Sequence, residues 1–128
     1  MNQYTIELQN RTKQFSVAII DIARAIKIDL INKNIISQIL RSSTSVGANY
    51  TEAVESESRD DFIHKLSICK KEANETKYWL ELLRTTNSSI GTKIDPLIQE
   101  VLELIKIFAA TIATTKRNKL LKQNGQTV

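Results

Sequence analysis

The side chains most often found in metal and nucleophile sites are scarce in this sequence. His64 and Cys69 are the only residues of their kinds, and they lie five positions apart. At that spacing they do not share one face of a helix. The Glu-x-x-His pairs of di-iron bundles are missing from the sequence. We therefore predict no metal site, with His64 on the surface and Cys69 in the core.

Motifs for covalent catalysis and for phosphate loops are missing as well. Ser45-Val46-Gly47 lacks the G-x-S-x-G pattern and the strand–turn–helix context of a hydrolase nucleophile. Only three glycines occur in the chain, and none belongs to a glycine-rich phosphate loop. We therefore expect no catalytic residues, no cofactor and no enzymatic activity.

A set of polar side chains falls on the apolar faces of the second and third predicted helices. Its members are Arg41, Ser45, Asn49, Glu52, Glu72 and Glu75. Buried polar groups need hydrogen-bond partners. We predict a structural network in which Arg41 pairs with glutamates and fixes the helix register or the contacts between subunits. A ligand or general-base site and simple solvent exposure are the alternatives.

Positive charge is concentrated at the C-terminal end of the chain. The formal net charge is +4, yet all 14 acidic residues precede residue 104. Lysine and arginine contacts to phosphates dominate nucleic-acid binding. The candidate phosphate contacts are Lys116, Arg117, Lys119 and Lys122 of the last helix with Arg11 and Lys13 of the first, to which Arg24 and Lys27 add. The lack of aromatic residues in the tail disfavours specific recognition of single strands.

An acidic turn offers a different role for the same charges. It contains Glu52, Glu55, Glu57, Asp60 and Asp61 against a single Arg59. In an up-down bundle this turn lies beside the end of the last helix, so the two clusters can neutralise each other within or between subunits. The basic residues also suit the negative end of the helix dipole. Phosphate binding and internal neutralisation both remain open at this point.

The elements that position these residues are a few long helices. The chain has 128 residues, which suits one domain, with three glycines and one proline. Apolar periodicity predicts helices over residues 6–28, 33–57 and 58–85, the third with Ser58 as N-cap and Asp61 at its third position. A fourth helix is expected to begin at Thr92 or Asp95, with Pro96 in its first turn.

Short loops between such helices favour an all-α, antiparallel up-down-up-down four-helix bundle. We expect the bundle to span residues 1–122 and residues 123–128 to be a disordered tail. Gly47 lies inside the second predicted helix, where glycine is unfavourable. We therefore expect a neighbouring helix to approach its backbone closely.

Two apolar stripes run side by side along the fourth predicted helix. The first contains Leu97, Val101, Leu104, Phe108 and Thr111, and the second contains Ile98, Leu102, Ile105, Ala109 and Ile112. One stripe is enough for a monomeric bundle, and two exceed the usual apolar arc. The surplus stripe predicts a subunit interface and hence a homo-oligomer.

The N-terminus has no signal-peptide pattern, and the longest apolar stretch, residues 104–112, is interrupted by Lys106. A membrane span needs about 20 apolar residues. We therefore expect a cytoplasmic protein with no membrane partner.

Two stretches resemble a known family. Residues 40–53, LRSSTSVGANYTEA, resemble the R-S-x-x-S-(I/V)-G-A-N-x-x-E-A motif of the bacterial four helix bundle proteins, also called 23S rRNA intervening-sequence proteins. Residues 61–80, DFIHKLSICKKEANETKYWL, are similar to the D-F-I-x-K-L-S-I-A-x-K-E-A-x-E-T-x-Y-W-L motif of that family. Two long motifs in the right order make the resemblance specific.

The resemblance implies a homopentameric barrel of four-helix subunits. It also implies kinship with the accessory variability protein of diversity-generating retroelements, which assembles with a reverse transcriptase and nucleic acid through basic surfaces. The family offers no catalytic residues to transfer. The expected function is therefore that of a non-enzymatic, homo-oligomeric accessory protein that binds RNA or DNA. The alternative is an oligomeric scaffold or adaptor for a reverse transcriptase or another protein, without direct nucleic-acid contact.

Overall fold

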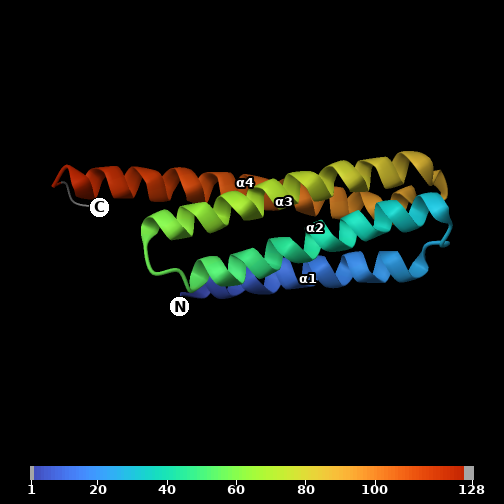
Figure 1. Ribbon diagram of the computed structural model, residues 1–128, viewed down its shortest axis with the longest axis horizontal. Coiled ribbons are helices and arrows are strands. Elements are labelled where there is room, and N and C mark those ends of the chain that lie inside the picture. Colours follow the sequence, from blue (N-terminus) through green and yellow to red (C-terminus); the bar gives the residue numbers. More distant parts are fainter. Residues whose placement is uncertain (1, 126–128) are drawn as a thin grey trace.

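The computed structural model describes residues 2–125 and contains four long helices in that range (Figure 1). They are α1 (Gln3–Ala25), α2 (Leu30–Val54), α3 (Arg59–Thr86) and α4 (Gly91–Gln123), with a single 3₁₀ turn, η1 (Ser88–Ile90), before α4. Successive helices run antiparallel, and α1 also contacts α4 over a shorter stretch than it contacts α2. The all-α, up-down-up-down four-helix bundle is confirmed.

The core consists of the stripes that the spacing predicts. In α3 the structure buries Leu66, Cys69, Ala73, Thr76, Leu80 and Leu83, and it leaves Phe62 half-buried. In α4 the first stripe is buried from Leu97 to Phe108. None of the helices in residues 2–125 has the apolar length of a membrane crossing.

Helix boundaries differ from the predicted ones because polar side chains cap the helices. Asn2 accepts a hydrogen bond from the Thr5 amide at 2.8 Å, so α1 begins three residues early. Asp29 accepts from the Asn32 amide at 2.8 Å, and the polar break therefore starts α2 at Leu30. The predicted cap of α3 is confirmed, because the Asp61 amide donates to the Ser58 hydroxyl at 3.0 Å. Capping groups satisfy amides that lack a partner in the first turn.

Of the two predicted starts of α4, Thr92 lies within one residue of the observed start and Asp95 is too late. The turn η1 continues directly into the helix at Gly91, which has helical dihedral angles. Pro96 is consequently the sixth residue of α4 and not part of its first turn. Its missing N–H leaves the Thr92 carbonyl without a helical partner, and Thr92 is exposed, so water can satisfy that group. At the other end α4 reaches Gln123, and residues 126–128 of the predicted tail lie outside the described residues.

Gly47 faces α1, but the approach is an ordinary one. A Cβ atom placed on Gly47 would lie 3.5–3.7 Å from Thr12, which is normal van der Waals contact. The expected close backbone approach is therefore not needed within one chain. Nothing in the packing of α1 on α2 compensates for the conformational cost of this glycine.

We predict that Gly47→Ala raises the free energy of unfolding by about 0.5–1 kcal/mol, because alanine removes that cost without a clash. Urea unfolding followed by circular dichroism measures the change. Ala48→Gly is the matched control, since Ala48 is the exposed neighbour of Gly47 in α2. This substitution should lower the free energy of unfolding by about as much as Gly47→Ala raises it. A destabilised Gly47→Ala would show that the glycine is required for packing.

Candidate functional site

Arg41 joins α2 to two glutamates of α3. Its guanidinium donates to Glu72 at 3.2 Å and also pairs with Glu75. The indole N–H of Trp79 donates to the same Glu75 carboxylate at 3.3 Å, and Arg41 reaches Gln38 at 3.4 Å. The cluster lies at the rim of the helix pair, because the Arg41 side chain is 48% exposed. Such a clamp fixes the register of α2 against α3.

The other three residues of the predicted network are not connected to this clamp. Asn49 donates to the carbonyl and the hydroxyl of Ser45 at 2.8 and 3.0 Å, one turn away on α2. Glu52 accepts from Lys65 of α3 at 2.6 Å. The structure therefore divides the predicted network into three separate groups.

Two polar contacts were missed by the sequence analysis. The hydroxyls of Ser42 and Thr76 lie 2.7 Å apart in the seam between α2 and α3, with both side chains fully buried. Asn32 and Asn87 exchange amide hydrogen bonds at 3.0 and 3.1 Å and connect the α1–α2 loop to the end of α3. Ser42 is next to Arg41, a residue of the predicted polar network, so its place between α2 and α3 could have been predicted. Nothing in the sequence around Asn32 and Asn87 indicates that they pair.

Two of the candidate phosphate contacts have acidic partners. Arg11 donates through two nitrogens to both carboxylate oxygens of Glu100, at 2.7 and 2.8 Å. Lys119 pairs with Asp60 of the acidic turn. The hydrogen bond to Glu100 raises the pKa of Arg11 above its ordinary value. A phosphate would have to compete with these carboxylates.

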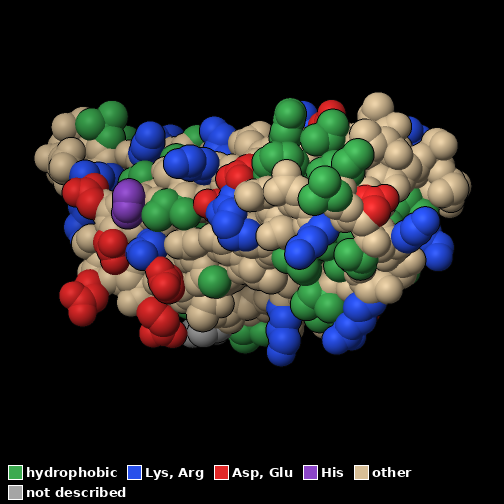
Figure 2. Space-filling model, turned by 45° about the vertical axis from the view of Figure 1, so that its right-hand side comes forward, with side chains coloured by type: hydrophobic (Ala, Val, Ile, Leu, Met, Phe, Trp, Pro, Cys, Tyr) green, Lys and Arg blue, Asp and Glu red, His purple; other side chains and the backbone are tan. Residues whose placement is uncertain are grey.

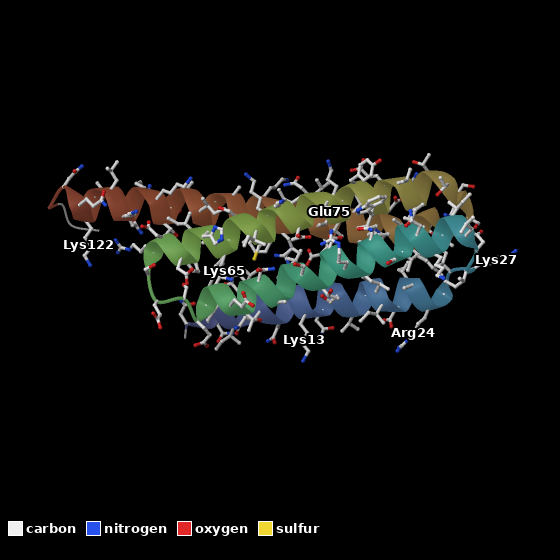
Figure 3. The ribbon with its side chains drawn as sticks, in the orientation of Figure 1. Lys13, Arg24, Lys27, Lys65, Glu75 and Lys122 are labelled. Carbon is white, nitrogen blue, oxygen red and sulfur yellow. The ribbon has the colours of Figure 1, made fainter. Side chains whose placement is uncertain are left out.

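The remaining basic candidates have no ion-pair partner among residues 2–125. They form two groups, one of Lys13, Arg24 and Lys27 and one of Lys116, Arg117 and Lys122. Figure 3 shows Lys13, Arg24 and Lys27 pointing away from the bundle along and just beyond α1. In Figure 2, Lys and Arg side chains occupy the lower right edge, whereas Asp and Glu gather at the lower left. Of the four basic residues predicted on and near α1, three therefore remain unpaired in the described residues after Arg11 pairs with Glu100.

A shallow groove of about 340 Å³ follows the line between α1 and α2 beside Lys13. Gln9 and Asn10 contribute amides to its walls, which otherwise include Thr44, Ala48 and Thr51. The amides can donate to phosphate or sugar oxygens, whereas the hydroxyls of Thr44 and Thr51 already donate to the Leu40 and Gly47 carbonyls. The groove therefore adds two amide groups to the polar surface of α1.

Groups able to perform chemistry do not converge in the described residues. Cys69 is fully buried, and burial raises the pKa of its thiol to about 12. His64 is exposed on α3. Within residues 2–125 no cluster of histidine, cysteine and acidic side chains has the arrangement of a metal site.

The second apolar stripe of α4 is left half-buried. Ile98, Leu102, Ile105, Ala109 and Ile112 are all partly exposed beside the fully buried first stripe. Ile98, Ile105 and Ile112 touch the core cluster, while Leu102 does not. This face of α4 presents apolar surface that one subunit does not cover.

The Arg41 clamp leads to a pH-dependent prediction. The hydrogen bond from Arg41 lowers the pKa of Glu75, and the Trp79 indole adds to the effect. Because the folded-state pKa is depressed, this pair contributes stability above the unfolded pKa of about 4.3 and loses it as pH falls through the folded value. We expect Glu75→Gln to destabilise by about 0.2–1 kcal/mol at neutral pH, the range of exposed ion pairs.

The difference in stability between Glu75→Gln and the unmodified protein should vanish in acid, because Glu75 is then protonated in both the folded and the unfolded state. Trp79 is the only tryptophan of the chain, so a shift of its emission reports the loss of the Glu75 contact directly. Glu81→Gln is the matched control, because Glu81 pairs with Lys77 on the same helix at 3.4 Å, away from the indole contact. Unchanged emission and stability in Glu75→Gln would contradict the clamp.

Comparisons with known proteins agree with this fold. The family model for the 23S rRNA-intervening sequence protein matches residues 5–110. A solved structure from Bacteroides thetaiotaomicron, described as a protein of unknown function from the S23 ribosomal protein family, is 38% identical with a TM-score of 0.71. The similarity covers 81% of this chain and 96% of that one. No curated protein matches the chain. The chain belongs to the 23S rRNA-intervening sequence protein family.

Proposed function

We propose that this protein is a non-enzymatic, homo-oligomeric accessory protein that binds nucleic acid through basic surfaces. The observation that carries the proposal is the set of unpaired cations on α1 and at the end of α4. The family name, which refers to 23S rRNA intervening sequences, makes structured RNA the first ligand to test. The pentameric barrel implied by the family resemblance is the proposed assembly.

The half-buried stripe of α4 supports the assembly. Contiguous apolar side chains on a helix face mark interaction surfaces when one subunit leaves them uncovered. Leu102 is central to this face and lies outside the cluster of buried core residues, and part of its side chain stays exposed in one subunit. Burial of this face in a second copy would remove it from water.

Light scattering coupled to gel filtration tests the assembly. We expect a mass several times the 14.5 kDa of one chain. Leu102→Asp should lower that mass, because a carboxylate in an apolar interface is strongly unfavourable. Ala110→Asp is the matched control, since Ala110 is exposed on another face of α4, and it should leave the mass unchanged. A mass of 14.5 kDa for the unmodified protein would refute the assembly.

The distribution of paired and unpaired cations supports the nucleic-acid interface. Lys13 and Arg24 stand eleven residues apart on α1, which corresponds to about 16 Å along a helix. That distance is long enough for the two side chains to reach different phosphates of one backbone. The neighbouring groove adds the amide donors of Gln9 and Asn10.

A salt-titrated shift assay with structured RNA and with duplex DNA tests the interface. Removing one lysine or arginine that binds a phosphate should reduce the slope of log affinity against log salt by about 1. We expect Lys13→Ala with Arg24→Ala, and separately Lys116→Ala with Arg117→Ala, to weaken binding at every salt concentration.

The control for both pairs is Lys70→Ala with Lys77→Ala. It removes the same charge from α3, outside both proposed surfaces. Equal losses of affinity in control and test variants would mean that only net charge matters. No binding at low salt would refute the nucleic-acid function.

The ion pairs of Arg11 and Lys119 favour a second candidate function. They show that part of the basic surface is used internally, as expected for an oligomeric scaffold or adaptor whose partner is a protein, such as a reverse transcriptase. Affinity capture from a lysate treated with nuclease distinguishes the two functions. One stoichiometric protein that survives the treatment would favour the adaptor.

A further inference from the structure

The loop between α1 and α2, together with the first turn of α2, carries three exposed aliphatic side chains. Ile28, Leu30 and Ile31 are 61%, 87% and 64% exposed. They form an apolar tip at the end of the bundle where α1 ends and α2 begins (Figure 1). Single exposed apolar residues are common, but three within four positions form a patch that calls for an explanation.

This tip is held in place by its own polar groups. The Asn32 side chain donates to the Lys27 carbonyl at 3.0 Å and exchanges hydrogen bonds with Asn87 of α3. Asp29 caps α2, and its carbonyl accepts from the Lys33 amide at 2.9 Å. These hydrogen bonds fix the backbone that carries the aliphatic side chains. A preorganised surface loses little conformational entropy when it binds.

The opposite end of the bundle has a groove of about 370 Å³ between the starts of α1 and α3 and the end of α2. Its lining is mixed, with Asn2, Thr5 and Glu55 as polar residues and Tyr50, Val54 and Phe62 as apolar or aromatic ones. Tyr50 is buried, whereas Val54 and Phe62 are half-buried and pack against the core. The groove thus offers the exposed parts of Val54 and Phe62 to aliphatic side chains, with polar groups beside them.

The charges around the tip and the groove have opposite signs. Arg24, Lys27 and Lys33 surround the tip without ion-pair partners in the described residues, and the Asp29 carboxylate lies among them as the cap of α2. Glu55, Glu57 and Asp61, close to the groove, also lack ion-pair partners there, and Arg59 is a cation of the same turn. Of the unpaired cations of α4, Lys122 lies beside Asp60 and Arg59. Such complementarity selects one orientation of two copies.

We propose that the apolar tip of one copy docks into the groove of a second copy. The contact joins opposite ends of the chain, so it is heterologous and generates a closed ring or a filament. It is separate from the α4 face discussed above and goes beyond the proposed function. The aliphatic side chains supply the buried area, and the charges set the orientation.

Engineered cysteines test the contact directly. Leu30→Cys and Val54→Cys proteins, differently tagged, are mixed and oxidised. We expect disulfide-linked heterodimers from the mixture and none from either variant alone. The native Cys69 is fully buried and its thiol pKa is raised to about 12, so it does not contribute to cross-linking. Asn74→Cys, exposed in the middle of α3, is the control and should not cross-link with Leu30→Cys.

A charge exchange tests the orientation. Lys27→Glu with Lys33→Glu in the Leu30→Cys protein should reduce the cross-link by roughly tenfold at low salt. Adding Glu55→Lys with Glu57→Lys to the Val54→Cys partner should restore most of the yield. These four positions are exposed, and circular dichroism verifies that the variants fold.

Every other outcome overturns the proposal. Cross-links from Leu30→Cys alone would indicate contact between two tips. The lack of any cross-link at positions 30 and 54, with a native circular dichroism spectrum, would exclude the docking of copies. Binding to vesicles of anionic lipid that Leu30→Asp abolishes, without cross-links, would identify a membrane surface as the occupant. The cross-link reports contact between positions 30 and 54, whereas light scattering reports the oligomer proposed through α4. The two proposals can therefore fail independently, and the two measurements tell these failures apart.

Discussion

The seam between α2 and α3 is the contact on which the rest of the bundle depends. Small side chains fill it, with Ser42, Val46, Cys69, Ala73 and Thr76 all fully buried. Short side chains let two helices approach closely, but each buried hydroxyl then needs a partner within the seam. Ser42 and Thr76 meet this need through each other and through the Ile39 and Glu72 carbonyls of their own helices, and their mutual contact favours one register of the two helices. The clamp of Arg41 at the rim fixes the same register from outside the core.

The register of the seam decides which charges meet at the ends of the bundle. Once α3 is fixed against α2, and α4 packs against α3, Lys119 comes beside Asp60 and the start of α3 lies below the end of α4. Internal neutralisation removes Lys119 from the basic surface, and Glu100 does the same for Arg11 on the other side of α4. The cations that remain unpaired are thus selected by helix packing. Both internal neutralisation and free basic surface, which the sequence left as alternatives, are present in the same molecule.

The elements that the sequence predicted well are those with a long repeated pattern. The stripe of α3 runs without interruption, and burial follows it from Leu66 to Leu83 because a helix repeats its faces regularly. The ends were predicted less well, since a cap depends on a single side chain and its local geometry. Asp29 looked like part of a polar break, and only its bond to the Asn32 amide shows that it starts α2. The pairing of Asn32 with Asn87 spans 55 positions and follows from the tertiary fold alone. The same reason explains why Glu100 was not identified as the partner of Arg11, whereas the pairing of Lys119 with the acidic turn was one of the two predicted alternatives.

The two uncovered apolar surfaces differ in physical character. The second stripe of α4 is half-buried and partly in contact with the core, so it is continuous with the interior of the bundle. Substitutions there affect both folding and association, and Leu102 is informative because it lies apart from the core cluster. The tip formed by Ile28, Leu30 and Ile31 is different, because Asn32, Asp29 and Asn87 hold the loop while the aliphatic side chains remain in water. The exposed parts of these side chains, which are most of Leu30 and more than half of Ile28 and Ile31, leave water only if a second surface covers them. A chain that keeps such a tip on a rigid loop gains stability from it only when another molecule is bound.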